Sequence, residues 1–116
     1  HPEAIETAGE PIPLTPGHSV AVSMVLHELG TNAAKYGALS HSNGRLRVEW
    51  QKAAADGGSQ VELVWEERGG SGVTPPAERG FGSRLIEQAV SYQLGGSVAM
   101  DYAPEGLTCR ISFPLK

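Results

Sequence analysis

Apolar residues recur with a helical period between positions 17 and 36. Their spacing by three and four residues places them on one face of an α-helix. These residues are Val22, Val25, Leu26, Leu29, Ala33 and Tyr36. Thr15 suits the cap before such a helix and Pro16 its first turn, whereas Gly37 is typical of the residue just past a helix end. We therefore predict an amphipathic helix over 17–36.

Four later segments alternate apolar and polar residues with the period of two that a half-buried strand shows. They cover 45–51, 61–67, 98–102 and 107–113, and a second helical period covers 83–94. Pro11 to Leu14 can form only a short edge strand, because proline donates no ladder hydrogen bond. The residues before Pro11 lack any period and are expected to form a fraying entry. This order predicts a two-layer α/β sandwich, whose mixed and mostly antiparallel sheet is covered by helices on one face.

Composition and charge narrow the class of protein. The 116 residues suit one domain over 1–116, and a hydrophobic content of 40% is enough for a core. The formal net charge of −4, with both signs interspersed, argues against a nucleic-acid groove and a polybasic membrane contact. The single cysteine, Cys109, suits a small core residue in a reducing compartment. No apolar run is long enough to span a membrane and no signal peptide opens the chain, so we expect a soluble, cytoplasmic domain.

A polar stripe runs along one border of the apolar face of the first helix. At about 100° per residue, Glu28, Asn32 and Lys35 line up there, and His27 projects well away from them. The Asn32 side-chain oxygen suits Mg²⁺, and Glu28 can orient or deprotonate a metal-bound water or act as a base. The Lys35 ammonium can meet a phosphate as a point charge. The alternative is a solvated polar face of the helix.

The segment 69–82 is rich in glycine and lacks an apolar period. Glycines let a backbone approach a ligand closely, and the helix start that follows Gly80-Phe81-Gly82 offers N–H groups to an anion. We interpret this turn as a phosphate contact; the alternative is an ordinary loop. Neither a P-loop nor a dinucleotide fingerprint is present.

Glu67 ends a predicted strand just before these glycines. A carboxylate at the mouth of a cleft can accept a hydrogen bond from an exocyclic amine such as that of adenine. The alternative is an exposed charge at a strand end. Trp65 is expected in the core or in a wall of the cleft.

The histidines do not point to a zinc site. His27 and Glu28 begin like a zinc-protease helix, but position 31 is Thr, so the second ligand is absent. His18 and His41 lack ligand spacing and are expected on the surface.

The run from His27 to Ser40 resembles the N box of bacterial sensor histidine kinases, and within them the HWE subgroup. That subgroup is named for a His in the N box and a Trp-x-Glu further along, which here are His27 and Trp65-Glu66-Glu67. Glu67-Arg68-Gly69-Gly70 is similar to the first glycine box of the family, with Glu where others have Asp. Gly80-Phe81-Gly82 is similar to the second. The match covers nearly the whole chain.

The resemblance implies a Bergerat ATP-binding fold of the GHKL superfamily, in which ATP lies between the N-box helix and a lid formed by the glycine-rich loop. Asn32 would bind Mg²⁺, Glu28 would support the metal-bound water or act as a base, and Lys35 would lie near the phosphates. Glu67 would read the adenine amine. The residues implied to lie beside the nucleotide or to shape its pocket and lid are Tyr36, Gly69, Gly80, Phe81 and Gly82.

By the same resemblance, the whole protein transfers the γ-phosphoryl group of ATP to a histidine on a separate dimerisation domain. The group then passes to an aspartate of a response-regulator receiver domain, and the whole protein is expected to be a homodimer. The 116 residues hold no phosphoacceptor helix, so this chain is expected to bind ATP without phosphorylating itself. Two alternatives remain: a serine kinase of the anti-sigma-factor type, and a non-catalytic module that binds nucleotide or docks a partner.

Overall fold

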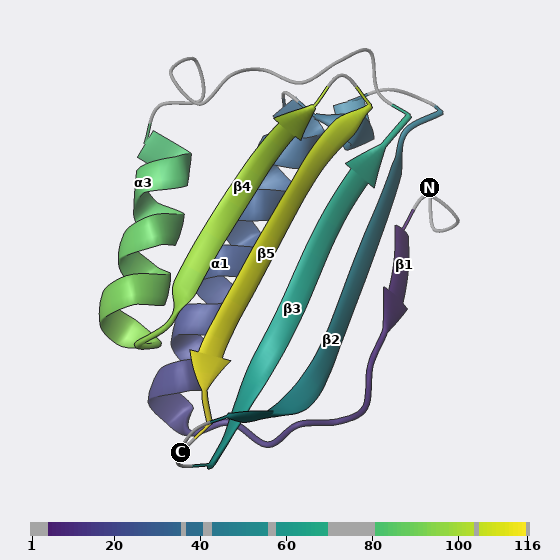
Figure 1. Ribbon diagram of the computed structural model, residues 1–116. Coiled ribbons are helices and arrows are strands. Elements are labelled where there is room, and N and C mark those ends of the chain that lie inside the picture. The colour runs from purple at the N-terminus through teal and green to yellow at the C-terminus, as the bar shows by residue number, and fades with distance from the viewer. Residues whose placement is uncertain are drawn as a thin grey trace.

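The computed structural model describes residues 5–35, 37–40, 43–55, 58–69, 81–103 and 105–115 of the chain. A five-stranded sheet forms one layer, and α1 and α3 form a second layer on one face of the sheet (Figure 1). The strands are β1 (Ile5–Ala8), β2 (Arg45–Ala55), β3 (Gly58–Arg68), β4 (Ser97–Ala103) and β5 (Gly106–Pro114). The helical elements are α1 (Pro16–Lys35), the 3₁₀ turn η2 (Ala38–Ser40), α3 (Phe81–Gln88) and the π-helical turn η3 (Ala89–Gln93). The predicted two-layer α/β sandwich is confirmed.

The strands follow the order β1-β2-β3-β5-β4 across the sheet. β2 and β3 form one antiparallel hairpin, β4 and β5 form another, and the antiparallel pairing of β3 with β5 joins the two. β1 pairs in parallel with β2, so that Ile5 lies opposite Leu46. The sheet is therefore mixed and mostly antiparallel, as the sequence predicts.

The N-terminal strand is not where the sequence pattern put it. The strand predicted over Pro11 to Leu14 is wrong, and β1 lies earlier, in the segment for which we expected no element. Ile12 and Leu14 instead pack, partly buried, against the core. All four residues of β1 are exposed, so the strand has no buried face and its sequence needs no alternation of apolar and polar residues. The strand is defined instead by its pairing with β2, which is distant in sequence.

α1 begins and ends close to its predicted bounds. Thr15 caps it, because the Thr15 Oγ1 accepts the His18 N–H at 3.2 Å and the Thr15 carbonyl accepts the Ser19 N–H at 2.8 Å. His18, expected on the surface, is half-buried, and its ring meets the Phe113 ring edge-on with the centroids 5.6 Å apart. The cap fixes where the helix enters the fold.

The second helix differs from its prediction in form. α3 begins at Phe81 and passes at Ala89 into η3, where the Leu94 N–H donates to the Ala89 carbonyl at 3.1 Å. Widening a helix to π geometry adds a residue to the turn, which a search with the 3.6-residue period does not detect. Across the described ranges, no helix is both long and apolar enough to cross a membrane.

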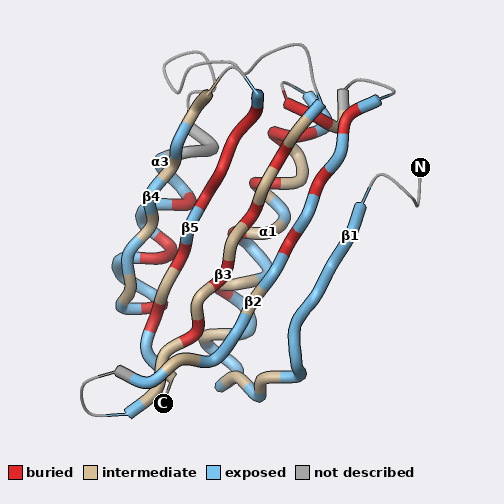
Figure 2. Tube along the Cα trace, turned by 45° about the vertical axis from the view of Figure 1, so that its right-hand side comes forward, coloured by how far each residue is buried: buried red, intermediate tan, exposed pale blue. Residues whose placement is uncertain are grey.

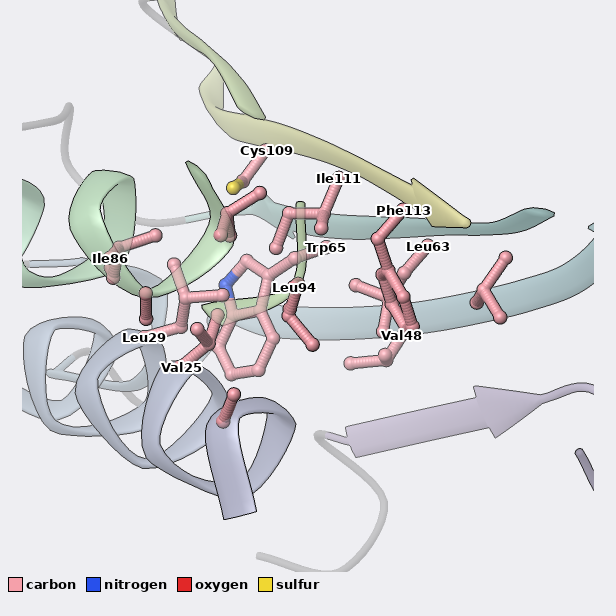
Figure 3. Close-up of a cluster of buried hydrophobic side chains, with 14 of the residues drawn as sticks. Val25, Leu29, Val48, Leu63, Trp65, Ile86, Leu94, Cys109, Ile111 and Phe113 are labelled. Carbon is pink, nitrogen blue, oxygen red and sulfur yellow. The ribbon is translucent and has the colours of Figure 1, made fainter. Parts of the chain in front are cut away.

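The core lies between the helices and the sheet face that they cover. Buried positions alternate with exposed or half-buried ones along β2 and β3 (Figure 2), because successive strand side chains point to opposite faces. The Trp65 indole reaches from β3 toward Val25 and Leu29 of α1 (Figure 3). Cys109 is fully buried there, and burial, together with the charge of Glu67, raises the pKa of its thiol to about 12. Both Trp65 and Cys109 are thus core residues, as predicted.

Candidate functional site

Three polar side chains lie along one border of α1, where its buried face meets its exposed face. Asn32 is buried, with 6% of its surface exposed, Glu28 is half-buried and Lys35 is exposed in the last turn. Within the described part of the chain, no hydrogen bond or ion pair engages these three side chains. The Asn32 amide is not among the fully buried side-chain polar groups that lack a partner in the described residues, so its polar atoms reach the surface, where a ligand can meet them.

The chemistry of this border fits a hard cation held together with an anion. Asn32 and Glu28 supply oxygen atoms, which Mg²⁺ prefers, and Mg²⁺ usually completes its shell with waters and phosphate oxygens. Lys35 adds a positive charge one turn further along the helix. His27 is exposed on the helix surface and stands apart from this set, as the helical spacing predicts.

Glu67 is the last core-facing residue of β3, and it has no exposed surface. Its Oε1 accepts the Ala38 N–H at 3.1 Å, and its Oε2 accepts the Trp65 indole N–H at 2.8 Å. The alternative of an exposed charge at a strand end is therefore wrong. Trp65 and Glu67 can be bonded because residues two apart on a strand share a face.

The turn that follows α1 is packed against the Glu67 carboxylate. The Gly37 N–H donates to the carbonyls of Asn32 at 3.1 Å and Ala33 at 3.2 Å, which ends the helix. A Cβ at Gly37 would collide with Glu67 Oε1, so a larger residue here would require the carboxylate to shift. Ala38 comes next, and its N–H is the one that Glu67 holds. The end of α1 is thus fixed to the end of β3.

Arg68 ties this end of β3 to β5. Its Nη1 donates to the Glu67 carbonyl at 2.7 Å, and its Nη2 donates to Thr108 Oγ1 at 3.1 Å. Gly69 follows with a φ of 84°, and a Cβ there would lie 2.6 Å from the Asn43 carbonyl oxygen. Both the backbone conformation and the close approach require glycine at this position.

Four predicted site residues are placed only in part or not at all. Tyr36 and Gly80 lie outside the described residues. Phe81 and Gly82 form the start of α3, and the structure describes their backbone only. Their contribution to a nucleotide pocket stays a prediction.

Sequence reasoning missed how these parts are connected. It assigned Trp65 to the core and Glu67 to a ligand, and it did not link the two side chains or find the Ala38 N–H. The signal was present in the Trp-x-Glu spacing, which places an indole N–H and a carboxylate on one face of a strand.

The opposite border of α1 has a different chemistry. Val22, Leu26 and Gly30 line an open apolar cavity of about 640 Å³, whose other walls come mainly from β1, the segment after it, β2 and β3. Almost all of its lining is apolar, so it offers no group suited to a phosphate or a metal ion. The polar border is therefore the candidate site.

No family model matches the chain. Blue-light-activated histidine kinase 1 of Erythrobacter litoralis (strain HTCC2594) is 39% identical over an alignment 116 positions long, which covers 97% of this chain and 31% of that protein. A blue-light-activated histidine kinase of Brucella anthropi is 35% identical over 111 residues, which are 96% of this chain and 23% of that protein. The chain thus spans about a quarter to a third of the length of these relatives.

Solved structures show the same fold. The histidine kinase domain of the Erythrobacter litoralis EL346 blue-light-activated histidine kinase has a TM-score of 0.73 at 21% identity, covering 96% of this chain and 51% of that chain. The catalytic domain of the histidine kinase ThkA has a TM-score of 0.70 at 13% identity, covering 96% of this chain and 78% of that one. The fold is that of histidine kinase catalytic domains. With the sequence relatives, it places the chain in the histidine kinase family, as the N-box resemblance predicts.

Proposed function

We propose that this chain binds ATP with Mg²⁺ as the catalytic domain of a sensor histidine kinase of the HWE type. The observation that carries the proposal is the Asn32 amide, which is nearly buried, has no partner within the described chain and lies between Glu28 and Lys35 on α1. The family to which the chain belongs supports the same function. The whole protein would then phosphorylate a histidine on a separate dimerisation domain, act as a homodimer and pass the group to a response regulator.

In this proposal the residues of α1 orient the reacting end of the nucleotide. Asn32 offers its side-chain oxygen to Mg²⁺, Glu28 accepts a hydrogen bond from a metal-bound water or acts as a base, and Lys35 faces the phosphates. When bound, Mg²⁺ neutralises charge that develops on the phosphate oxygens during transfer. Catalysis of phosphoryl transfer consists mostly of such positioning and charge stabilisation.

The other predicted residues would contact the adenine base of the nucleotide or form the lid over it. Tyr36 would pack beside the nucleotide, and Gly69 and the run Gly80-Phe81-Gly82 would shape the pocket and its lid. Glu67 has two acceptor sites in use and further lone pairs. It would either accept the adenine amine directly or act by holding the end of α1.

Calorimetric titration of ATP with Mg²⁺ tests the proposal. We expect the native chain to bind and Asn32→Ala to weaken binding at least about tenfold, whereas Asn43→Ala, at an exposed asparagine, should leave the affinity unchanged. Absence of binding by the native chain would contradict the proposal and favour a docking module.

The isolated chain should bind ATP without labelling itself. Incubation with γ-labelled ATP and Mg²⁺ should give no stable protein-bound phosphate. Stoichiometric, acid-labile label on a histidine of this chain would contradict the assignment of the acceptor to a separate domain, and acid-stable label would indicate a serine kinase.

A further inference from the structure

The apolar cavity on the opposite border of α1 has a size typical of a small-molecule site. Its volume is about 640 Å³, and ligand pockets in proteins commonly have about 300–1,000 Å³ and are lined mainly by hydrophobic and aromatic side chains. Val22, Leu26 and Gly30 of α1 form one wall, and core-facing residues of β2 and β3 form the floor. The cavity therefore has room for a ligand of its own, apart from the polar border.

The segment that connects β1 to α1 supplies a further wall (Figure 1), and Trp50 of β2 holds this segment in place. The Trp50 indole N–H donates to the Glu10 carbonyl at 2.8 Å. Gly9 lies so close to the same indole that a Cβ there would collide with the ring. Ile12 and Leu14 follow in the segment and line the cavity. This wall is tied to the sheet, so its position does not depend on a ligand.

The side chains that line the cavity determine the chemistry of the ligand. None of the described lining residues carries a charge, and their side-chain polar groups are the Thr7 hydroxyl and the indole N–H groups of Trp50 and Trp65. Both indole N–H groups already donate, one to Glu10 and the other to Glu67. A charged ligand would lose its hydration here without gaining partners, whereas burial of apolar surface is favourable. The lining therefore selects an uncharged, apolar ligand.

Gly30 is an independent indication that a ligand approaches this wall. It lies inside α1, where glycine is less favourable than alanine. A Cβ at Gly30 would meet no atom within 4 Å, so packing within the described chain does not require glycine there. Glycine lets a ligand approach the backbone closely, and a molecule in the cavity that lies against α1 would account for it.

We propose that this cavity binds an uncharged, apolar small molecule, of the size of a long-chain alcohol or of a compound with two or three aromatic rings. An apolar cavity of about 150 Å³ is enough to bind benzene, so the cavity beside α1 admits a larger molecule. An extended peptide suits it less, because its backbone N–H and C=O groups would find no partners in the lining. A helix, about 10 Å across, could insert only single side chains. The site lies on the border of α1 opposite Asn32 and does not rest on the proposed function.

Titration with N-phenyl-1-naphthylamine, an uncharged probe whose fluorescence rises in apolar surroundings, tests the proposal. The native chain should bind the probe saturably, and an excess of decanol should displace it. Gly30→Phe places a ring at the cavity wall and should weaken probe binding about tenfold or more, because a hydrophobic pocket is sensitive even to one added methylene. The matched variant is Gly17→Phe, at an exposed glycine of α1 that does not line the cavity and whose Cβ would also meet no atom within 4 Å. It should bind the probe as the native chain does.

A second pair of variants tests the apolar character of the wall. Leu26→Glu adds a carboxylate to the lining and should also weaken probe binding, since the charge keeps its water and disfavours an apolar ligand. Val20→Glu adds the same charge to α1 at a residue that is 66% exposed and does not line the cavity, so it should leave binding unchanged. Circular dichroism verifies that each variant is folded at the temperature used.

Three results would overturn the proposal. The first is the absence of saturable binding by the native chain. The second is an equal effect of the lining variants and their matched controls, because the probe would then bind elsewhere. The third comes from the same titration on the whole protein: if the whole protein does not bind the probe although this chain does, another part of the protein covers the cavity.

Discussion

Glu67 shows how much one buried charge depends on its neighbours. Its oxygens accept one indole N–H and one backbone N–H, and neither bond is exposed to water. A buried hydrogen bond to a charged group contributes about 1.5–3 kcal/mol, and removing one partner leaves the other group unsatisfied. The indole of Trp65 therefore stabilises the fold both through its apolar contacts and through one N–H.

The two tryptophans should differ in their effect on stability. We expect Trp65→Phe to lower the free energy of unfolding by about 2–4 kcal/mol, from the lost hydrogen bond and the smaller ring. Trp50→Phe should cost about 1 kcal/mol or less, because its bond to Glu10 is exposed to solvent. Urea denaturation followed by circular dichroism measures both values. An equal loss of the free energy of unfolding in both variants would show that the buried bond to Glu67 contributes no more to stability than the exposed bond to Glu10.

Cys109 predicts a pH dependence at the alkaline end. Burial, and then the charge of Glu67, raises the pKa of this thiol from 9.0 to about 12 in the folded chain. Between these values the unfolded chain loses its proton and the folded chain keeps it. The protonated Cys109 thiol therefore contributes to the free energy of unfolding below pH 9. This contribution is lost as the pH rises toward 12, by up to about 1.4 kcal/mol per pH unit.

The measurement is the free energy of unfolding at several pH values for the native chain and for Cys109→Ala. Stability of the native chain should fall more steeply above pH 9 than that of the variant, since both share every other titrating group. Parallel curves would contradict the assignment of this slope to Cys109. The same burial predicts that the folded chain reacts slowly with thiol reagents at pH 8.

At the scale of elements, α1 has one buried face that lies between a polar border and an apolar border. The border with Glu28, Asn32 and Lys35 is polar, and the border with Leu26 and Gly30 faces the apolar cavity. The end of the helix is held by a carboxylate from β3. The effect of a substitution in or just after α1 on the free energy of unfolding should therefore depend on the side of the helix at which the residue lies.

Two glycine substitutions test this dependence. A Cβ at Gly30 would have no atom within 4 Å, so Gly30→Ala should raise the free energy of unfolding by about 0.5–1 kcal/mol through helix propensity. At Gly37 the Cβ would collide with Glu67 Oε1, so Gly37→Ala should destabilise by about 1–3 kcal/mol. Chemical denaturation distinguishes the two variants, because the expected changes in the free energy of unfolding have opposite signs. A stabilising Gly37→Ala would show that the carboxylate can move away at little cost.

At the scale of the whole molecule, binding of the nucleotide should stabilise the fold. A ligand at about one hundred times its dissociation constant adds about 2.7 kcal/mol to the free energy of unfolding. For a chain of 116 residues this corresponds to a rise in Tm of roughly 10 °C. Differential scanning fluorimetry should show the rise with ATP and Mg²⁺ and only a small rise with ATP and EDTA. An equal rise with and without Mg²⁺ would contradict a metal role for Asn32.

The sequence was sufficient for those parts of the molecule that rest on local periodicity. The long helix, the four strands of the two hairpins and the border with Asn32 follow from spacing alone. β1 could not be found in this way, because its residues are exposed and its pairing with β2 is distant in sequence. The burial of Glu67 could not be found either, since it depends on where the end of α1 meets the end of β3.

The order of the strands has a consequence for how the chain folds. β2–β3 and β4–β5 are hairpins that can form early from neighbours in sequence, whereas the β3–β5 pairing must close the long loop between them. The entropic cost of closing a flexible loop grows slowly, by about 0.6 kcal/mol for each doubling of its length. Joining the two hairpins is therefore the expected slow step of folding. A change in the length of chain between the two hairpins should therefore alter the rate of this step only slightly.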